Sequence, residues 1–127
     1  MRKPLEILRL YPGHDYTLRG AIASRAQRDP QRPFMLFGDK TWSWREFASA
    51  VESAACALIA QGIRKGDRVA IMARNSDGHV LLLFALARIG AIMVPVNPEF
   101  GVDEARYVLH HADVSGVAAG RDRKSVV

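Results

Sequence analysis

The sequence predicts an α/β fold, with a short hairpin followed by a parallel βαβαβ unit. Two observations lead to this prediction. Short apolar runs alternate with segments of helical periodicity from residue 68 to residue 118. Glycine, proline and helix-capping residues separate these segments. Strands that alternate with helices favour parallel pairing through right-handed crossovers.

The first third of the chain is predicted to supply an arm, a helix and the hairpin. Residues 1–16 have weak periodicity and are predicted to form an irregular arm. Thr17 is a suitable N-cap for the helix that follows it. Residues 34–37 are predicted to form a strand and residues 38–40 a turn, and a return strand is predicted to begin at Thr41.

The clearest helix in the sequence begins near Ser43. Ser43 and Glu46 have the spacing of a capping box, and Gly62 is placed to end the helix. Cys56 lies one step off the apolar stripe and is predicted to be a small buried filler, because a reactive thiol needs a base or a cationic setting. The stripe consists of Phe47, Val51, Ala54, Leu58 and Ile59.

The βαβαβ unit is predicted from the second half of the chain. Periodicity alone does not decide whether residues 80–87 form a buried helix or a strand, but the length and the Gly90 stop favour a helix. Pro95 is expected near a strand end, because proline donates no ladder hydrogen bond. The predicted strands are 68–72, 91–96 and 114–118, and the helices run from an Asn75 or Ser76 cap to Arg88 and over 103–111.

Composition excludes several classes of protein. The chain has 127 residues, 49% of them hydrophobic and 24% charged, which suits one ordered globular domain. The net charge is +5, but residues 1–10 and 121–127 each contribute +2, so we expect no nucleic-acid partner. Cys56 is the only cysteine, which excludes an internal disulfide and favours a cytoplasmic location. The apolar run 80–87 is too short for a transmembrane segment.

The motifs of common catalytic and cofactor sites are missing from the sequence. It has no P-loop, no dinucleotide-binding fingerprint and no nucleophile elbow. His110 and His111 are adjacent, so they cannot form the i, i+4 pair of a zinc helix. We therefore predict no catalytic, cofactor-binding or metal-binding residues in this chain.

Three groups of residues have both a functional and a structural interpretation. Residues 75–78 could bind an anion at a helix N-terminus, but simple capping is favoured because no glycine-rich loop accompanies them. Trp42 and Trp44 could form an exposed interface, but packing against Phe34, Leu36 or Phe47 is favoured. A third group, around a turn, is predicted to be solvated surface: Arg64, Lys65 and Arg68.

Three segments resemble motifs of the adenylate-forming enzymes, in the family's order and spacing. Residues 42–47 (WSWREF) are similar to an early aromatic motif, and residues 62–70 (GIRKGDRVA) to a turn and strand. Residues 86–98 (LARIGAIMVPVNP) resemble a second core motif. The resemblance covers roughly residues 17–119 and is greatest to acyl-CoA ligases, especially of the carnitine/crotonobetaine type. Asn97 stands where peptide-synthetase adenylation domains usually have aspartate, which favours a ligase.

The resemblance implies a two-step reaction for a longer parent enzyme of fatty acid metabolism. A carboxylate would attack the α-phosphate of ATP, and the thiol of coenzyme A would then displace AMP, with magnesium assisting. The family's phosphate loop, ribose-binding aspartate and catalytic lysine match no position here, so the chain alone is expected to be inactive and to hold no cofactor. Its expected partner is the remainder of its own parent domain. The alternatives are a self-standing α/β binding module and a piece of another adenylate-forming enzyme, such as a peptide-synthetase domain.

This interpretation divides the chain into three parts. Residues 1–16 are the arm, and residues 17–120 are predicted to be a partial N-terminal AMP-binding domain. Residues 121–127 are interpreted as a non-native tail, because residues 122–127 can be encoded by the start of a common sequencing-library adapter. The alternative is a natural basic tail.

Overall fold

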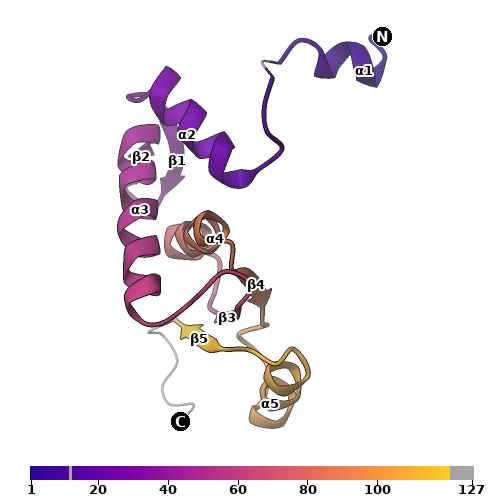
Figure 1. Cartoon of the computed structure of the whole chain (residues 1–127), viewed down its shortest axis with the longest axis vertical. Coiled ribbons are helices and arrows are strands. Elements are labelled where there is room, and N and C mark those ends of the chain that lie inside the picture. Colours follow the sequence, from indigo (N-terminus) through magenta and orange to yellow (C-terminus); the bar gives the residue numbers. More distant parts are fainter. Residues whose placement is uncertain (12, 121–127) are drawn as a thin grey trace.

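The computed structural model describes residues 1–11 and 13–120 (Figure 1). The predicted tail, residues 121–127, lies outside the described residues. The described residues form a two-stranded hairpin, a three-stranded sheet and five helices. In chain order the elements are α1 (Pro4–Leu8), α2 (Leu18–Arg28), β1 (Pro33–Phe37), β2 (Lys40–Ser43), α3 (Trp44–Ala60), β3 (Arg68–Met72), α4 (Asp77–Ile89), β4 (Ile92–Pro95), α5 (Val102–His111) and β5 (Gly116–Ala119).

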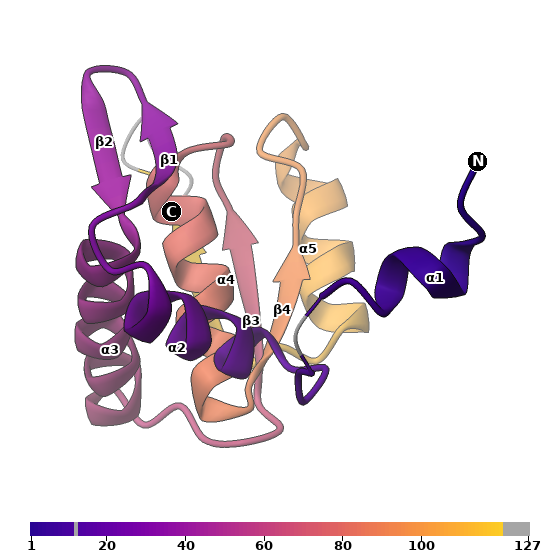
Figure 2. The same cartoon turned by 90° about the horizontal axis from the view of Figure 1, so that it is seen from above.

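The larger sheet is parallel, as the alternation of strands and helices predicted. Its strand order is β4-β3-β5, and β3 pairs in parallel with both neighbours. The chain passes from β3 outward to β4 and then returns across β3 to β5. Because the two crossovers run in opposite directions, a common right-handed twist places α4 and α5 on opposite faces of the sheet. Figures 1 and 2 show this arrangement, with α4 on one side of β3 and α5 on the other.

The central strand β3 is buried on both faces. Val69 and Ile71 pack with Leu86 of α4. Ala70 and Met72 point the other way and pack with Ala105 of α5. Alternate side chains of a strand point to opposite faces, so a continuous apolar run is what a strand covered on both sides requires.

A separate aromatic cluster joins the hairpin to the helices. Phe47 of α3 is fully buried, and its ring centroid lies 4.8 Å from that of Phe34 and 5.7 Å from that of Phe84. Trp44 packs against Phe34 at 4.1 Å, and Trp42 meets Phe47 edge-on at 5.8 Å. The predicted packing of both tryptophans is thus confirmed. Leu36, however, is 73% exposed and takes no part.

Most predicted boundaries agree with the structure to within two residues. Residues 80–87 lie in α4, which resolves the choice between helix and strand. Pro95 is the last residue of β4, and the next residue, Val96, donates the hydrogen bond to the carbonyl oxygen of Ile71 (3.0 Å). The proline therefore ends an edge strand without removing a ladder hydrogen bond.

The prediction of an irregular arm over residues 1–16 was wrong for α1. Pro4 occupies the first turn of this helix, where its missing N–H costs nothing, and Glu6 accepts a hydrogen bond from the backbone N–H of Lys3 (3.0 Å). These local signals were present in the sequence, but five residues are too few to show periodicity. In both views α1 stands apart from the rest of the chain (Figures 1 and 2).

The capping box of α3 should make stability depend on pH. The Ser43 hydroxyl accepts a hydrogen bond from the N–H of Glu46 (3.2 Å), and the Glu46 carboxylate accepts one from the N–H of Ser43 (2.9 Å). The hydrogen bond from the Ser43 N–H to the carboxylate is the main cause that lowers the pKa of Glu46, and a hydrogen bond from the Ser43 hydroxyl is the second cause. A carboxyl whose pKa is lower in the folded chain contributes stability above its unfolded pKa and loses it as pH falls through the folded pKa.

We therefore expect Glu46→Gln to flatten the loss of stability on acidification. Glutamine keeps the capping hydrogen bond but cannot titrate. The measurement is the urea midpoint of both chains across the acidic range below the usual glutamate pKa of about 4.3. Asp39→Asn is the control, because it removes an exposed carboxylate that makes no hydrogen bond in the described part of the chain. Equal acid dependence in wild type and Glu46→Gln would contradict the expectation.

Candidate functional site

The first candidate site lies at the carboxyl ends of β3 and β5. From β3 the chain crosses to β4 at one edge of the sheet and then to β5 at the other edge, so the strand order reverses between β3 and β5. Sheets of α/β proteins commonly bind ligands at such a switch point. The N-terminus of α4 lies at the carboxyl ends of these strands. The N–H of Gly120, just after β5, donates a hydrogen bond to the carbonyl oxygen of Met72 at the end of β3 (3.2 Å). This is where residues 75–78 were considered as an anion site.

Capping side chains already occupy the N-terminus of α4. The Ser76 hydroxyl accepts a hydrogen bond from the N–H of His79 (3.2 Å), and Asp77 Oδ1 accepts one from the N–H of Gly78 (2.8 Å). The other oxygen of Asp77 accepts a hydrogen bond from Trp42 Nε1 (3.0 Å), which ties the hairpin to α4. A carboxylate at this position complements the helix dipole and repels a second anion. The geometry therefore supports capping, the favoured interpretation.

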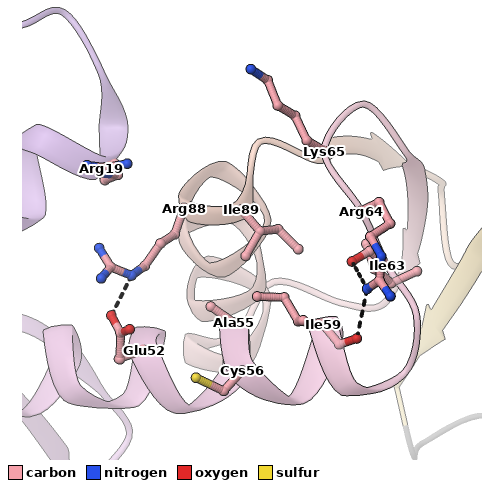
Figure 3. A pocket seen from close by; sticks show the side chains of 10 residues that line it. All are labelled: Arg19, Glu52, Ala55, Cys56, Ile59, Ile63, Arg64, Lys65, Arg88 and Ile89. Atoms are coloured by element: carbon pink, nitrogen blue, oxygen red, sulfur yellow. Dashed lines mark hydrogen bonds and ion pairs between the residues drawn. The ribbon is translucent and has the colours of Figure 1, made fainter.

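The second candidate site was not found from the sequence. It is a cavity of about 550 Å³ between α2, α3, the loop before β3 and the end of α4 (Figure 3). We call it the basic pocket. Its ten lining residues are Arg19, Glu52, Ala55, Cys56, Ile59, Ile63, Arg64, Lys65, Arg88 and Ile89.

The basic pocket combines an apolar floor with a cationic rim. Four cations and one carboxylate line it, which leaves a formal charge of +3. Arg88 forms an ion pair with Glu52 across the gap between α4 and α3. The Arg64 guanidinium donates to the carbonyl oxygens of Ile59 (3.1 Å) and Ile63 (3.4 Å) near the end of α3. In the part of the chain that is described, Lys65 has no hydrogen bond or ion pair.

The predicted solvated cluster of Arg64, Lys65 and Arg68 is therefore divided by the fold. Arg64 and Lys65 line the basic pocket, whereas Arg68 points to the end of α5. The Arg68 side chain donates to the carbonyl oxygen of Ala112 (2.6 Å) and pairs with the Asp113 carboxylate (2.9 Å). A cation at a helix C-terminus offsets the partial negative charge there, so Arg68 has a structural role.

Cys56 was wrongly predicted to be buried. It is exposed on α3 and lines the basic pocket. The buried residues of α3 are Phe47, Val51 and Ala55. Cys56 follows Ala55, and one residue turns a helix by about 100°, which moves its side chain out of the core.

Other kinds of site find no support in the described residues. Residues 1–11 and 13–120 contain no group of three histidine, cysteine, aspartate or glutamate side chains placed to hold a metal ion. His110 and His111 lie in the last turn of α5, where Tyr107 stacks on His111. None of the helices in these residues is both long and apolar enough to cross a membrane.

Comparison with known proteins identifies the family. Residues 22–126 match the AMP-binding enzymes, which is most of the chain. The chain belongs to the AMP-binding enzyme family. It is 32% identical to the mitochondrial medium-chain acyl-CoA ligase ACSF2 of Danio rerio over 119 residues, and 33% identical to tyrocidine synthase 3 of Brevibacillus parabrevis over 99 residues. These alignments cover 91% and 78% of this chain.

Solved structures of related proteins share the fold. A long-chain-fatty-acid CoA ligase from Rhodopseudomonas palustris, described as putative, superposes with a TM-score of 0.81 at 34% identity over 87% of this chain. The N-terminal subdomain of NpsA from Klebsiella oxytoca superposes with a TM-score of 0.76 at 31% identity over 83% of this chain. The chain spans 28% and 27% of these structures, and 19% of the length of ACSF2.

The resemblance motifs are structural elements in this chain. The 42–47 motif forms the end of β2 and the capped start of α3, and the 62–70 motif forms the turn that leads into β3. Asn97 Oδ1 accepts a hydrogen bond from the N–H of Glu99 (2.9 Å), closing a turn after β4. Aspartate can close the same turn, so the role of this residue is compatible with ligases and peptide synthetases alike.

Proposed function

We propose that this chain is the N-terminal part of an ATP-dependent acyl-CoA ligase. In the full-length protein a carboxylate would attack the α-phosphate of ATP, release pyrophosphate and form an acyl-adenylate. The thiol of coenzyme A would then displace AMP to give the thioester. The observation that supports this most is the alignment of 91% of the chain with an acyl-CoA ligase.

A peptide-synthetase adenylation domain is the second candidate. The likeness to tyrocidine synthase 3 and to NpsA favours it, and NpsA has been solved in an artificial fusion with ThdA as an adenylation–PCP di-domain of a peptide synthetase. The two candidates share adenylate formation and differ in the acceptor of the acyl group. Full-length protein loaded with radiolabelled carboxylate and ATP should transfer the label to free coenzyme A if it is a ligase. Transfer only to a carrier protein would support the second candidate instead.

We further propose that this chain contributes scaffold to the enzyme and that its partner is the rest of the same domain. The outer edge of β5 has no strand beside it among the described residues. Beside it lies a cavity of about 640 Å³ on the α5 side, and Val117 is 52% exposed there. A further right-handed unit in the direction of the β4 to β5 crossover would place its helix over this cavity. The apolar part of its lining is Met72, Val102, Ala105, Leu109, Val114, Val117 and Ala119.

This surface predicts poor solution behaviour for the chain alone. An open sheet edge beside exposed apolar side chains promotes association. We expect purified chain 1–127 to bind a hydrophobic dye strongly and to self-associate, and Val117→Asp to lower both signals. Leu36→Asp is the control, because Leu36 is 73% exposed on the hairpin, outside this surface. A monomer that binds no dye would contradict the expectation.

A further inference from the structure

The cations of the basic pocket lie at two ends of an apolar floor. Figure 3 shows Ile59 and Ile89 facing each other over the middle of the pocket. Arg19 and Arg88 stand on one side of this pair and Arg64 on the other, while Lys65 rises above the pair with its ammonium group directed outward. The four cations come from three segments of the chain, namely α2, the loop before β3 and α4, and α3 supplies part of the floor. The pocket therefore offers positive charge at both ends and apolar contact between them.

Both ends keep donors that the protein itself does not use. A guanidinium has five N–H donors, and Arg64 uses its Nη1 group on two carbonyl oxygens while Arg88 directs its Nε to Glu52. Among residues 1–11 and 13–120, no group pairs with the Lys65 ammonium, which is carried on a flexible stem. Hydrogen bonds from the Thr17 hydroxyl and backbone N–H are the main cause of the lowered pKa of Asp15. The charge of Arg19 adds a smaller effect without forming an ion pair. Among the described residues, Arg64 and Arg88 are thus engaged by the fold, whereas Arg19 and Lys65 have no side-chain hydrogen bond or ion pair.

Helix dipoles account for only part of this charge. The pocket lies near the C-termini of α3 and α4, where partial negative charge attracts cations. Arg64 caps α3, and Arg88 is in the last turn of α4, so these two serve the helices. Each terminus carries only about half a unit of charge. The positive charges of Arg19 and Lys65 therefore exceed the charge needed to balance the two helix termini and Glu52.

We propose that the basic pocket binds an organic dianion whose two acidic groups are joined by an apolar body, such as a medium-chain dicarboxylate. One acidic group would contact Arg19 and Arg88, and the other Arg64. The flexible Lys65 side chain would turn inward to join Arg64. The apolar body would lie over Ile59 and Ile89. A volume of about 550 Å³ is within the range of small-molecule sites. The proposal concerns this chain itself and does not depend on ligase activity.

Three probes of equal chain length test the proposal. Suberate has two carboxylates, octanoate has one, and the corresponding diol has none. The protein tested is chain 1–127 with Val117→Asp, a change outside the basic pocket that lowers the expected self-association. Saturation-transfer NMR or calorimetry should give saturable binding in the order suberate, octanoate, diol. Exposed charge pairs contribute modestly, so we expect suberate to bind about fivefold more tightly than octanoate at low salt. The preference should shrink at about 150 mM salt because the groups are exposed.

Substitutions test which cation binds each acidic group of the ligand. Arg19→Gln and Lys65→Gln change exposed side chains that the fold does not use, and each should abolish the preference for suberate over octanoate. Arg45→Gln is the matched control, since it removes the same charge from the exposed first turn of α3 and should preserve the preference. Circular dichroism checks that the variants fold. Equal affinity for suberate and octanoate, no saturable binding, or the same loss in Arg45→Gln would each overturn the proposal.

Discussion

Purified chain 1–127 is expected to show no carboxylate-dependent exchange of pyrophosphate into ATP and no acyl-CoA formation. Pyrophosphate departure needs cationic donors or a metal to stabilise the charge that develops on the phosphates. The sequence has no phosphate-loop motif, and Asp77 occupies the N-terminus of α4 at the switch point. Removing one such donor from an enzyme typically costs about 100- to 1,000-fold, so the absence of all of them should leave no measurable rate.

The positive control for the absence of activity is the full-length protein. The full-length protein that carries residues 1–119 should catalyse both the exchange and thioester formation under the same conditions. ATP should bind to the short chain no better than weakly, through positive charge that salt screens. Turnover by the short chain would refute the scaffold role. A full-length product that makes no adenylate would refute the ligase proposal itself.

The sequence predicted the fold well because its strongest signals are local. The capping box at Ser43 and Glu46 and the caps at Thr17 and Ser76 each satisfy backbone N–H groups within the next three residues. Gly90 adopts a φ of 75° at the end of α4, a conformation that glycine reaches without strain. Such signals depend on adjacent residues only, so they can be read without knowing the fold.

The candidate sites could not be predicted in the same way, because they depend on contacts between distant segments. The Trp42–Asp77 hydrogen bond joins residues 35 positions apart, and the Arg68 contact with Ala112 spans 44. Arg19 and Arg88 share the basic pocket only because α2 and α4 both pack against α3. From the sequence, Arg64, Lys65 and Arg68 appeared to be one cluster, and only the packing of α5 separates Arg68 from the others.

Phe47→Ala should be the most destabilising single substitution in the aromatic cluster. The Phe47 ring is fully buried and contacts Phe34 of the hairpin, Trp42 of the same hairpin and Phe84 of α4. Truncation of a buried phenylalanine typically costs about 3–5 kcal/mol through lost burial and the cavity that remains. A domain of this size has a total stability of about 5–15 kcal/mol, so the loss should leave the chain marginally folded or unfolded.

Phe37→Ala is the matched control, because it removes the same atoms from a site that is 47% exposed at the end of β1. Its cost should stay below about 1 kcal/mol, since little buried surface is lost. The measurement is urea unfolding followed by tryptophan fluorescence, and Trp42 and Trp44 both lie in the affected cluster. Phe47→Leu should fall between the two, because it keeps apolar volume but loses the edge-on ring contacts with Trp42 and Phe84. Equal unfolding midpoints for Phe47→Ala and Phe37→Ala would show that α3, the hairpin and α4 do not depend on this ring for their packing.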